Sequence, residues 1–302
     1  MTIRVGTSSW TDPTLLKAGW YPPEANTAEQ RLAHYASHFS LVEVDSTYYA
    51  MPSERNAVLW AERTPDDFTF NIKAFSLLTG HSATVNRLPV ALRESLPAEV
   101  TSAKRNVYMK DLPEPTQRWV WQAFARALLP LHESHKLGAI LLQFPPWFGI
   151  SRANKHYVEQ CRDSLPEMHL AIEFRNRSWM EERNALETLS LLKDQGMTFV
   201  CVDEPQGFRS SVPPVTAVTV PRLAMLRLHG RNTQNWEAKG ITAAERFRYL
   251  YHDTEIDELA VRVEELAGQA EETHVLFNNC YSDFGVRNAA QLAARISGES
   301  PT

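Results

Sequence analysis

Short apolar segments recur along the chain, and most are too short for helices and rich in β-branched or aromatic residues. Between most of them, apolar residues recur at helical spacing, as Leu32, Tyr35 and Phe39 do. Thr27 and Gln30, just before this stripe, have the spacing of a capping box. The chain therefore alternates between predicted strands and predicted helices. The predicted strands are 3–7, 41–47, 68–73, 139–144, 170–174, 198–203, 224–228 and 275–278.

Eight strands that alternate with helices in 302 residues predict a (β/α)8 TIM barrel, within the α/β class. The alternative is an open, doubly wound parallel sheet. The glycine-rich fingerprint typical of that alternative does not follow the first strand, where residues 6–10 read GTSSW. The pattern therefore favours the barrel.

Two connections depart from this rhythm. The connection over residues 75–137 is far longer than an ordinary strand–helix unit, and its first half is polar and irregular, so we expect a lid or subdomain-like insertion there. Residues 204–222 contain four prolines and no helical stripe, which predicts that no regular helix follows the sixth strand. No linker divides the chain, so residues 1–302 are predicted to form one domain.

The charge balance of the chain argues against some classes of binding partner. Thirty-one Lys and Arg residues against 36 Asp and Glu residues give a formal net charge of −5, which disfavours a broad nucleic-acid-binding surface. No segment reaches the roughly 18 apolar residues of a membrane-spanning helix. Cys161, Cys201 and Cys280 are too few and too widely spaced for a disulfide framework or zinc ligand pairs. These features predict a cytoplasmic protein, and they carry no signal of oligomeric state.

In a TIM barrel the functional residues lie at the C-terminal ends of the strands, and alternate side chains point inward. Alternation predicts that a dense set of polar side chains faces the barrel interior. A self-contained salt-bridge network that merely fixes the barrel is the alternative to a functional site. The predicted inward residues are Glu43, Asp45, Thr47, Lys73, Gln143, Glu173, Arg175, Asp203, Arg227, His229 and Asn278.

The seventh strand carries the sharpest local signal. Arg227 and His229 lie on one face of it, and Gly230 and Arg231 follow. A guanidinium suits a carboxylate or phosphate group of a ligand, but internal pairing of Arg227 to Glu173 or Glu43 is equally open. Arg231 is expected to be a surface loop residue.

Aromatic residues crowd the predicted rim of the barrel. Their flat faces suit a ring-bearing ligand, and packing of loops over the barrel mouth is the alternative. We select Trp10, Tyr48 and Trp179 as candidate walls of a substrate site. The full set is Trp10, Trp20, Tyr21, Tyr48, Tyr49, Trp147 and Trp179.

The sequence predicts no cofactor and no metal site. It contains neither an H-E-x-x-H motif nor the G-x-S-x-G motif of a nucleophilic serine. A divalent-cation site stays open as an alternative, because Mg²⁺ or Mn²⁺ could be bound by carboxylates converging from separate strands. The candidate ligands are Glu43, Asp45, Glu173 and Asp203.

The chain resembles the YecE-like family of uncharacterised proteins over nearly its whole length. The resemblance implies a TIM-barrel fold and no established activity, substrate or cofactor. At position 45 the family often has asparagine, where this chain has Asp45. The matching segments are GTSSW (6–10), F (39) with VEVDSTYY (42–49), W (60) with TP (64–65), FTFNIK (68–73), LLTGH (77–81), LLQFPP (141–146), EFR (173–175) with SW (178–179), RLHG (227–230) and FNN (277–279).

We expect an enzyme that uses acid/base chemistry on a small polar or anionic molecule. Glu173 is the predicted general acid or base, with Lys73 or His229 as its proton-transfer partner and Asp203 as a further catalytic candidate. Lys73 is alternatively a nucleophile of lowered pKa. A hydrolase that cleaves glycosides or phosphodiesters and a non-catalytic metabolite-binding barrel are the other hypotheses. The predicted substrate-binding residues are Trp10, Glu43, Thr47, Tyr48, Gln143, Arg175, Trp179, Arg227 and Asn278.

Overall fold

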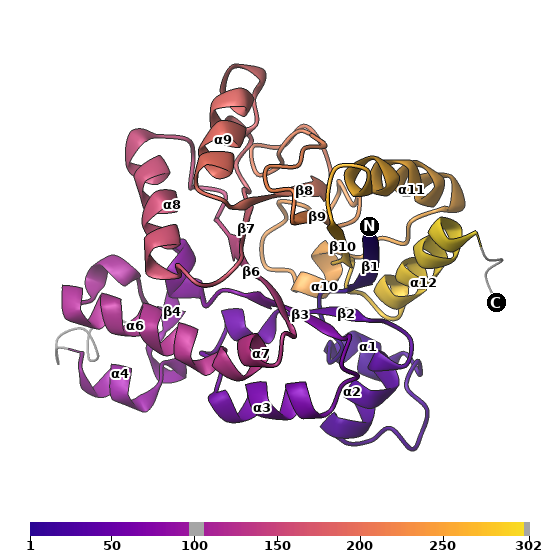
Figure 1. Ribbon diagram of the computed structural model, residues 1–302, viewed down its shortest axis with the longest axis horizontal. Helices are drawn as coiled ribbons and strands as arrows, with labels where there is room; N and C mark the ends of the chain where they lie inside the picture. The colour runs from indigo at the N-terminus through magenta and orange to yellow at the C-terminus, as the bar shows by residue number, and fades with distance from the viewer. Residues whose placement is uncertain (97–105, 299–302) are drawn as a thin grey trace.

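A closed barrel of parallel strands forms the centre of the molecule (Figure 1). The computed structural model describes residues 1–96 and 106–298. Within these residues eight strands join in the order β1-β10-β9-β8-β7-β6-β3-β2. Each coincides with a predicted strand, so the TIM barrel is confirmed and the open sheet is excluded. The strands are β1 (Thr2–Thr7), β2 (Leu41–Val44), β3 (Thr69–Lys73), β6 (Leu137–Gln143), β7 (Leu170–Glu173), β8 (Thr198–Asp203), β9 (Leu223–Leu228) and β10 (Glu272–Phe277).

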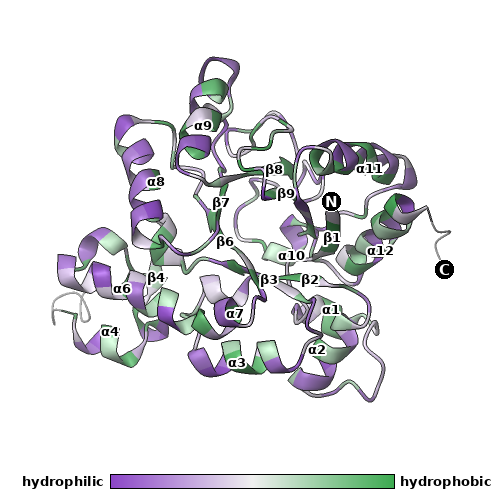
Figure 2. Ribbon diagram, viewed as in Figure 1, coloured by the Kyte–Doolittle hydropathy of each residue, from purple (hydrophilic) through white to green (hydrophobic). Residues whose placement is uncertain are grey.

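Helices surround the barrel and bury their apolar faces against it (Figure 2). The capping box predicted for α2 is present, since Thr27 and Gln30 bond each other's backbone amides. In the described parts of the chain, none of these helices is long and apolar enough to cross a membrane. The surrounding helices are α1 (Pro13–Lys17), α2 (Ala28–Ala36), α3 (Glu54–Glu62), α8 (Arg152–Ser164), α9 (Glu182–Asp194), α10 (Ala243–Arg246), α11 (Asp253–Ala267) and α12 (Phe284–Ser297).

The long connection between β3 and β6 forms short elements followed by one longer helix. Part of the predicted insertion, residues 97–105, lies outside the described residues. The antiparallel pair β4–β5 and α4 lie to one side of the barrel with α6, which contacts α8 (Figure 1). The elements are η2 (Ser76–Thr79), β4 (Ala83–Thr84), η3 (Val85–Arg87), α4 (Val90–Glu94), β5 (Asn106–Val107), η4 (Met109–Asp111), α6 (Glu114–Ala127) and α7 (Leu129–Glu133).

The connection between β8 and β9 contains no helix over residues 204–222, all of which the structure describes, as the prolines predict. The chain instead passes along β8, where the Phe199 amide donates a hydrogen bond to Thr219 Oγ1 at 2.8 Å. The Ala217 carbonyl accepts one from Cys201 Sγ at 3.5 Å. These contacts with the backbone of β8 take the place of helix packing.

The register of the strands decides which side chains face the barrel interior, because Cα partners in adjacent parallel strands point to the same face. Glu43 pairs with Asn71, and Gln143 pairs with Glu173. Lys73 lies two residues beyond Asn71 and therefore points to the same side. The register thus gathers the polar ends of β2, β3, β6 and β7 at the inner face of the C-terminal mouth.

Candidate functional site

Arg227 lies at the centre of the barrel and binds two glutamates at once. Its Nε and Nη2 donate to Glu43 Oε2 and Oε1 at 2.9 and 2.6 Å, and its Nη1 donates to Glu173 Oε2. All three side chains have 0% exposure. Both internal pairings left open by the sequence are therefore present. We call Glu43, Glu173 and Arg227 the barrel floor.

Glu173 has its hydrogen-bond acceptors occupied. Besides Arg227, Gln143 Nε2 donates to Oε1 at 2.7 Å, and the same oxygen lies 3.0 Å from His229 Nε2. Burial alone would raise the pKa of Glu173, but Arg227 and His229 hold this pKa well below its ordinary value. A carboxylate that is sealed and always ionised is a poor proton carrier. This geometry favours an electrostatic role over the predicted acid/base role.

His229 is locked by hydrogen bonds on both ring nitrogens. Since Glu173 is ionised, Nε2 carries the proton and donates it, and Nδ1 accepts from Asn278 Nδ2 at 2.9 Å. Burial lowers the pKa of His229 to about 4, despite the opposing effect of Glu173. The ring is therefore neutral and in one tautomer at neutral pH. This state does not favour the predicted role of His229 in proton transfer.

The state of His229 predicts a pH dependence of stability. Above pH 6.5 the ring is neutral in both the folded and the unfolded chain; as the pH falls from 6.5 to 4, only the unfolded chain gains this proton. The free energy of unfolding should therefore fall over this window. Nitrogen-15 NMR should show His229 as the neutral Nε2–H tautomer at pH 6. A ring that titrates near pH 6.5 would contradict the locked arrangement.

Lys73 differs from the floor residues because nothing in the described chain pairs with its charge. Nζ lies 5.0 Å from the centre of the Tyr48 ring, and it makes no hydrogen bond or ion pair with a described residue. The side chain is half-buried at the inner end of β3. Burial and Arg227 lower the pKa of Lys73, against the opposing effect of Glu43 and Glu173. Lys73 is thus an available amine at the barrel mouth.

Asp45 lies beside Lys73, and its carboxylate likewise accepts no hydrogen bond from a described residue, although its backbone carbonyl accepts one from the Tyr48 amide at 3.1 Å. Val44 of β2 and Ile72 of β3 are register partners, so the residues that follow them, Asp45 and Lys73, are neighbours. Burial raises the pKa of Asp45 to about 6, although Lys73 opposes the shift. The pair therefore joins an acid that titrates near neutral pH to an amine whose pKa is lowered.

The predicted continuation of the second strand through Thr47 is wrong. β2 ends at Val44, and residues Ser46–Tyr48 form a short 3-10 helix, η1. Thr47 Oγ1 lies 2.8 Å from the Val44 carbonyl oxygen and 2.6 Å from that of Lys73. Thr47 therefore holds the ends of β2 and β3 together, and its hydroxyl is occupied by backbone.

Arg175 and His81 complete the mouth. The Arg175 guanidinium stacks over Trp236 at 4.5 Å and approaches Glu173 Oε1 at 3.7 Å, but it donates no hydrogen bond to a described residue. His81 Nδ1 lies 2.9 Å from Thr79 Oγ1. Burial, together with the positive charges of Lys73 and Arg175, lowers the pKa of His81 to about 4. Lys73 and Arg175, which donate no hydrogen bonds to described residues, thus both favour the neutral form of His81.

Asp203 does not join this group. It is the register partner of Leu228, on the face away from Arg227, and the predicted inward orientation is therefore wrong. Its carboxylate accepts hydrogen bonds from Tyr251 at 2.8 Å and from Arg231 at 2.9 Å. Arg231 is accordingly a half-buried partner of Asp203 and not the free surface residue expected.

Glu204 follows β8 on its inner side, because Val202, two residues before it, is the register partner of Arg227; sequence reasoning missed this residue. It is 3% exposed, and its Oε2 lies 3.5 Å from Arg175 Nε without a properly formed hydrogen bond. Burial raises the pKa of Glu204 to about 8, against the charge of Arg175. Because Glu204 is mostly protonated at neutral pH, it compensates little of the charge of Arg175, and Glu173 at 3.7 Å is the ionised carboxylate near it.

Two predicted wall residues are packing residues instead. Trp179 has 0% exposure, stacks on Phe174 at 4.1 Å and donates from Nε1 to the Phe148 carbonyl at 2.6 Å. Trp10 packs edge-on against Trp60 at 6.0 Å. For these two tryptophans the loop-packing alternative holds, and they do not line the mouth.

Tyr48 and Trp147 are aromatic residues on the His81 side of the mouth. Their rings lie 5.2 and 5.5 Å from that of His81, and Trp147 is 64% exposed. Together with His81 they form an aromatic rim beside Lys73. A ligand that enters the mouth would pass these rings.

The carboxylates proposed as an alternative metal site do not converge. Glu43 and Glu173 are bonded to Arg227, and Asp203 lies on the opposite face of its strand. Over residues 1–96 and 106–298, no group of three or more His, Cys, Asp or Glu side chains is arranged to hold a metal ion. The described geometry therefore gives this alternative no support.

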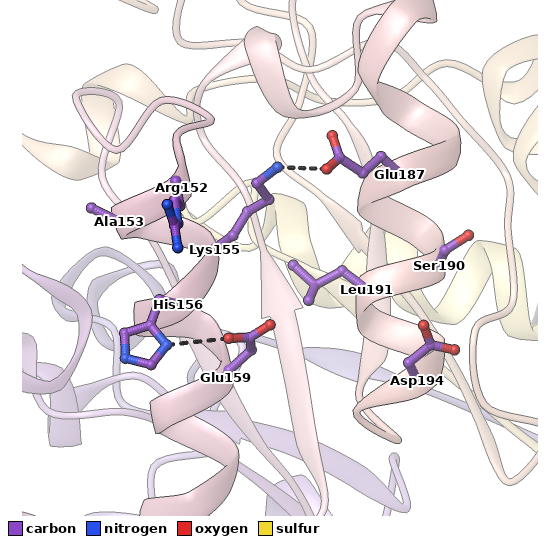
Figure 3. A pocket seen from close by; sticks show the side chains of 9 residues that line it. All are labelled: Arg152, Ala153, Lys155, His156, Glu159, Glu187, Ser190, Leu191 and Asp194. Atoms are coloured by element: carbon purple, nitrogen blue, oxygen red, sulfur yellow. Dashed lines mark hydrogen bonds and ion pairs between the residues drawn. The ribbon is translucent and has the colours of Figure 1, made fainter.

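A separate open groove of about 900 Å³ lies between α8 and α9, on the outside of the barrel (Figure 3). Lys155 Nζ and Glu187 Oε1 form an ion pair across it at 2.5 Å. None of the predicted site residues lines this groove. Its polar walls are typical of a solvated surface between two helices.

Comparison with known proteins gives one consistent family. The family model described as "Protein of unknown function DUF72" matches residues 4–301. UPF0759 protein YunF of Bacillus subtilis is 31% identical over 293 residues, which cover 96% of this chain and 93% of YunF. UPF0759 protein YecE of Escherichia coli K12 is 25% identical over 205 residues, or 67% of this chain and 59% of YecE.

Solved structures of the same family share the fold. A DUF72 family protein from Enterococcus faecalis V583 has a TM-score of 0.79 and 30% identity, and the match covers 99% of this chain and 96% of that one. A DUF72 family protein from Thermotoga maritima has a TM-score of 0.73 and 33% identity, covering 98% of this chain and all of the other. These comparisons agree with the barrel and assign no chemistry to its mouth.

Proposed function

The chain belongs to the DUF72 family of TIM-barrel proteins, and we propose that it is an enzyme that moves protons on a small anionic substrate at the C-terminal mouth of its barrel. The observation that carries this proposal is that Lys73 and Arg175 donate no hydrogen bond to a described residue, whereas the floor's own Arg227 is fully hydrogen-bonded; Arg175 only approaches Glu173 and Glu204, at 3.7 and 3.5 Å. Buried or half-buried cations without partners are unfavourable in the empty protein. An anionic group of a substrate would provide the missing partner.

Asp45 and Lys73 are the proposed proton-transfer groups. Efficient general acids and bases have pKa values near the working pH, and the pKa of about 6 for Asp45 meets this condition. The floor residues Glu173 and Arg227, with His229 and Gln143 bonded to Glu173, would fix the electrostatic potential beneath the pair. Asn278 would act through His229.

The hydrolase alternatives receive less support. A glycoside hydrolase needs two carboxyl groups that face the sugar from opposite sides of a cleft. Glu43 and Glu173 instead share one guanidinium and have 0% exposure. A metal-dependent phosphodiesterase would need ligands that do not converge among the described residues.

The start of the connection over residues 75–137 would supply one wall of the proposed site. It contributes His81, and the Tyr157 hydroxyl of α8 donates to the Leu78 carbonyl at 3.0 Å, which ties the start of this connection to the barrel. We propose that the segment around His81 borders the mouth, and that the other described elements of the connection form a subdomain-like insertion beside the barrel within one domain. The three cysteines are unpaired, which agrees with a cytoplasmic location.

Two measurements test the proposal. Pyruvate and inorganic phosphate, as probe anions, should bind the wild type, and Arg175→Gln should weaken binding by about tenfold or more, since a hydrogen bond between charged groups contributes about 1.5–3 kcal/mol. Arg183→Gln is the matched control, because Arg183 is 79% exposed on α9. Equal affinity in the two variants would contradict the anion site.

The second measurement separates catalysis from binding. Proton NMR in heavy water should show loss of C–H signal from small 2-oxo acids with the wild type, and slower loss with Asp45→Asn. Binding that depends on Arg175 without any exchange would favour the non-catalytic binding barrel and would contradict an enzyme acting on this substrate class.

A further inference from the structure

Lys73 is unusual when compared with the other buried cations of the chain. Lys136, which is 5% exposed, donates from Nζ to the Ala61 and Thr64 carbonyls at 2.6 and 2.7 Å. Arg227 donates to both floor glutamates. Lys73 Nζ faces only the Tyr48 ring at 5.0 Å. Buried cations that stabilise a fold have oxygen partners, and Lys73 has none among the described residues.

We propose that Lys73 is a covalent nucleophile, whose amine forms an imine with the carbonyl carbon of an aldehyde or ketone that carries an anionic group. This inference rests on the proposed function and names its substrate class. The geometry that supports it is the position of Nζ at the inner end of β3, beside an aromatic ring, with no hydrogen bond to hold the amine in its charged form. A lysine that only binds an anion would not need its charged form to be disfavoured.

The surroundings of Lys73 supply the condition that this chemistry requires. Only an unprotonated amine attacks a carbonyl, and burial together with Arg227 lowers the pKa of Lys73. In the empty site the neutral amine is therefore more populated at neutral pH than on a surface lysine. The Tyr48 ring lies 5.0 Å from the amine, and the His81 ring packs edge-on against Tyr48 at 5.2 Å.

Asp45 completes the step as a carrier of protons. The amine nitrogen forms a bond to the carbonyl carbon, the C=O π electrons move to the oxygen, and one proton passes from the nitrogen to that oxygen to give a neutral carbinolamine. The hydroxyl then leaves as water when it is protonated by Asp45, and the C=N bond forms, with no oxidant or reductant involved. The resulting iminium accepts the electron pair of an adjacent C–H bond, and the Asp45 carboxylate takes up the released proton.

Arg175 and His81 indicate that the substrate also carries an anionic group. Arg175 lies at the same mouth and has N–H groups that donate no hydrogen bond to a described residue. Its positive charge, together with that of Lys73, lowers the pKa of His81. A guanidinium suits a planar carboxylate or a phosphate oxygen. The expected substrate is therefore a small carbonyl compound whose carboxylate or phosphate reaches Arg175 while its carbonyl reaches Lys73.

Reductive trapping tests this inference on the whole chain. The protein is incubated with pyruvate and sodium cyanoborohydride at pH 7.5, and the adduct is located by peptide mass mapping. We expect one adduct per chain, on Lys73, formed faster than any on Lys155, because a lowered pKa raises the neutral fraction of the amine. Lys73→Arg, which keeps the charge, should abolish it, and Lys155→Arg should not.

The outcomes separate this inference from the proposed function. Adducts spread evenly over the surface lysines, unchanged by Lys73→Arg, would overturn the imine. If pyruvate still binds in an Arg175-dependent way and undergoes proton exchange, the proposed function stands and only the covalent step is wrong. If binding, exchange and trapping all fail, both are wrong. Circular dichroism of Lys73→Arg confirms that a lost adduct is not a lost fold.

Discussion

Arg227→Met should lower the free energy of unfolding by about 3–5 kcal/mol, the usual penalty for removing one partner from a buried ion pair. The substitution leaves Glu43 and Glu173, both with 0% exposure, without the guanidinium that binds them. Methionine fills part of the space and provides no hydrogen-bond donor. Urea unfolding, monitored by circular dichroism, measures the decrease in the free energy of unfolding. A variant that does not fold at all would be the extreme case of this decrease.

The pH dependence of this loss identifies its cause. In the wild type the pKa of Glu173 lies well below its ordinary value, so its ionised form stabilises the fold at neutral pH. In the variant the buried carboxyls would favour protonation, so the deficit should be smaller at pH 5 than at pH 8. Arg183→Met, on the surface of α9, is the control and should leave stability unchanged. A loss that is small, or equal at both pH values, would contradict the floor described above.

Lys73→Met should change stability in the opposite direction. It removes a half-buried charge that has no partner among the described residues, and we expect a gain of about 0.5–2 kcal/mol at pH 7, as when residues kept for function are replaced. The same variant should lose the pyruvate adduct completely. A variant that gains stability and loses the pyruvate adduct identifies a residue that is kept for function and not for the fold.

The sign of the pH effect follows from the lowered pKa of Lys73. Between that pKa and the ordinary value of 10.5, the unfolded chain binds this proton and the folded chain releases it, so wild-type stability rises with pH relative to the variant. The advantage of Lys73→Met should therefore shrink as the pH approaches 10.5. Lys155→Met, which removes a surface ion pair with Glu187, should show no such trend. A loss of stability in Lys73→Met would show that Lys73 has a structural partner.

The barrel was predictable from the sequence because its strands are short and buried, and most are separated by apolar residues at helical spacing. Register was harder. On β8 every residue is buried on both faces, so apolar alternation cannot tell which side faces the interior. Asp203 was therefore placed inside in error, and Glu204, one residue further, was overlooked. On β2 the strand ends at Val44, which alternation could not show.

The residue types of the site were predictable, but their pairing was not. Alternation correctly placed Glu43, Lys73, Glu173 and Arg227 on the inner face. Which cation forms ion pairs with the glutamates depends on distances between strands that are far apart in sequence. Arg227 pairs with both Glu43 and Glu173, and Lys73 therefore has no ion-pair partner among the described residues. Trp179 was misjudged because an aromatic residue after a strand suits a rim and a core equally well.

Titration of the Lys73 side chain is the most direct test of this account. Nitrogen-15 NMR of labelled lysine, with the signal assigned by Lys73→Arg, reports its pKa in the intact protein. We predict a midpoint below the ordinary value of 10.5, and a further decrease in Asp45→Asn, which removes a charge that favours the ammonium form. A midpoint at or above 10.5 that Asp45→Asn leaves unchanged would contradict an available amine at the barrel mouth.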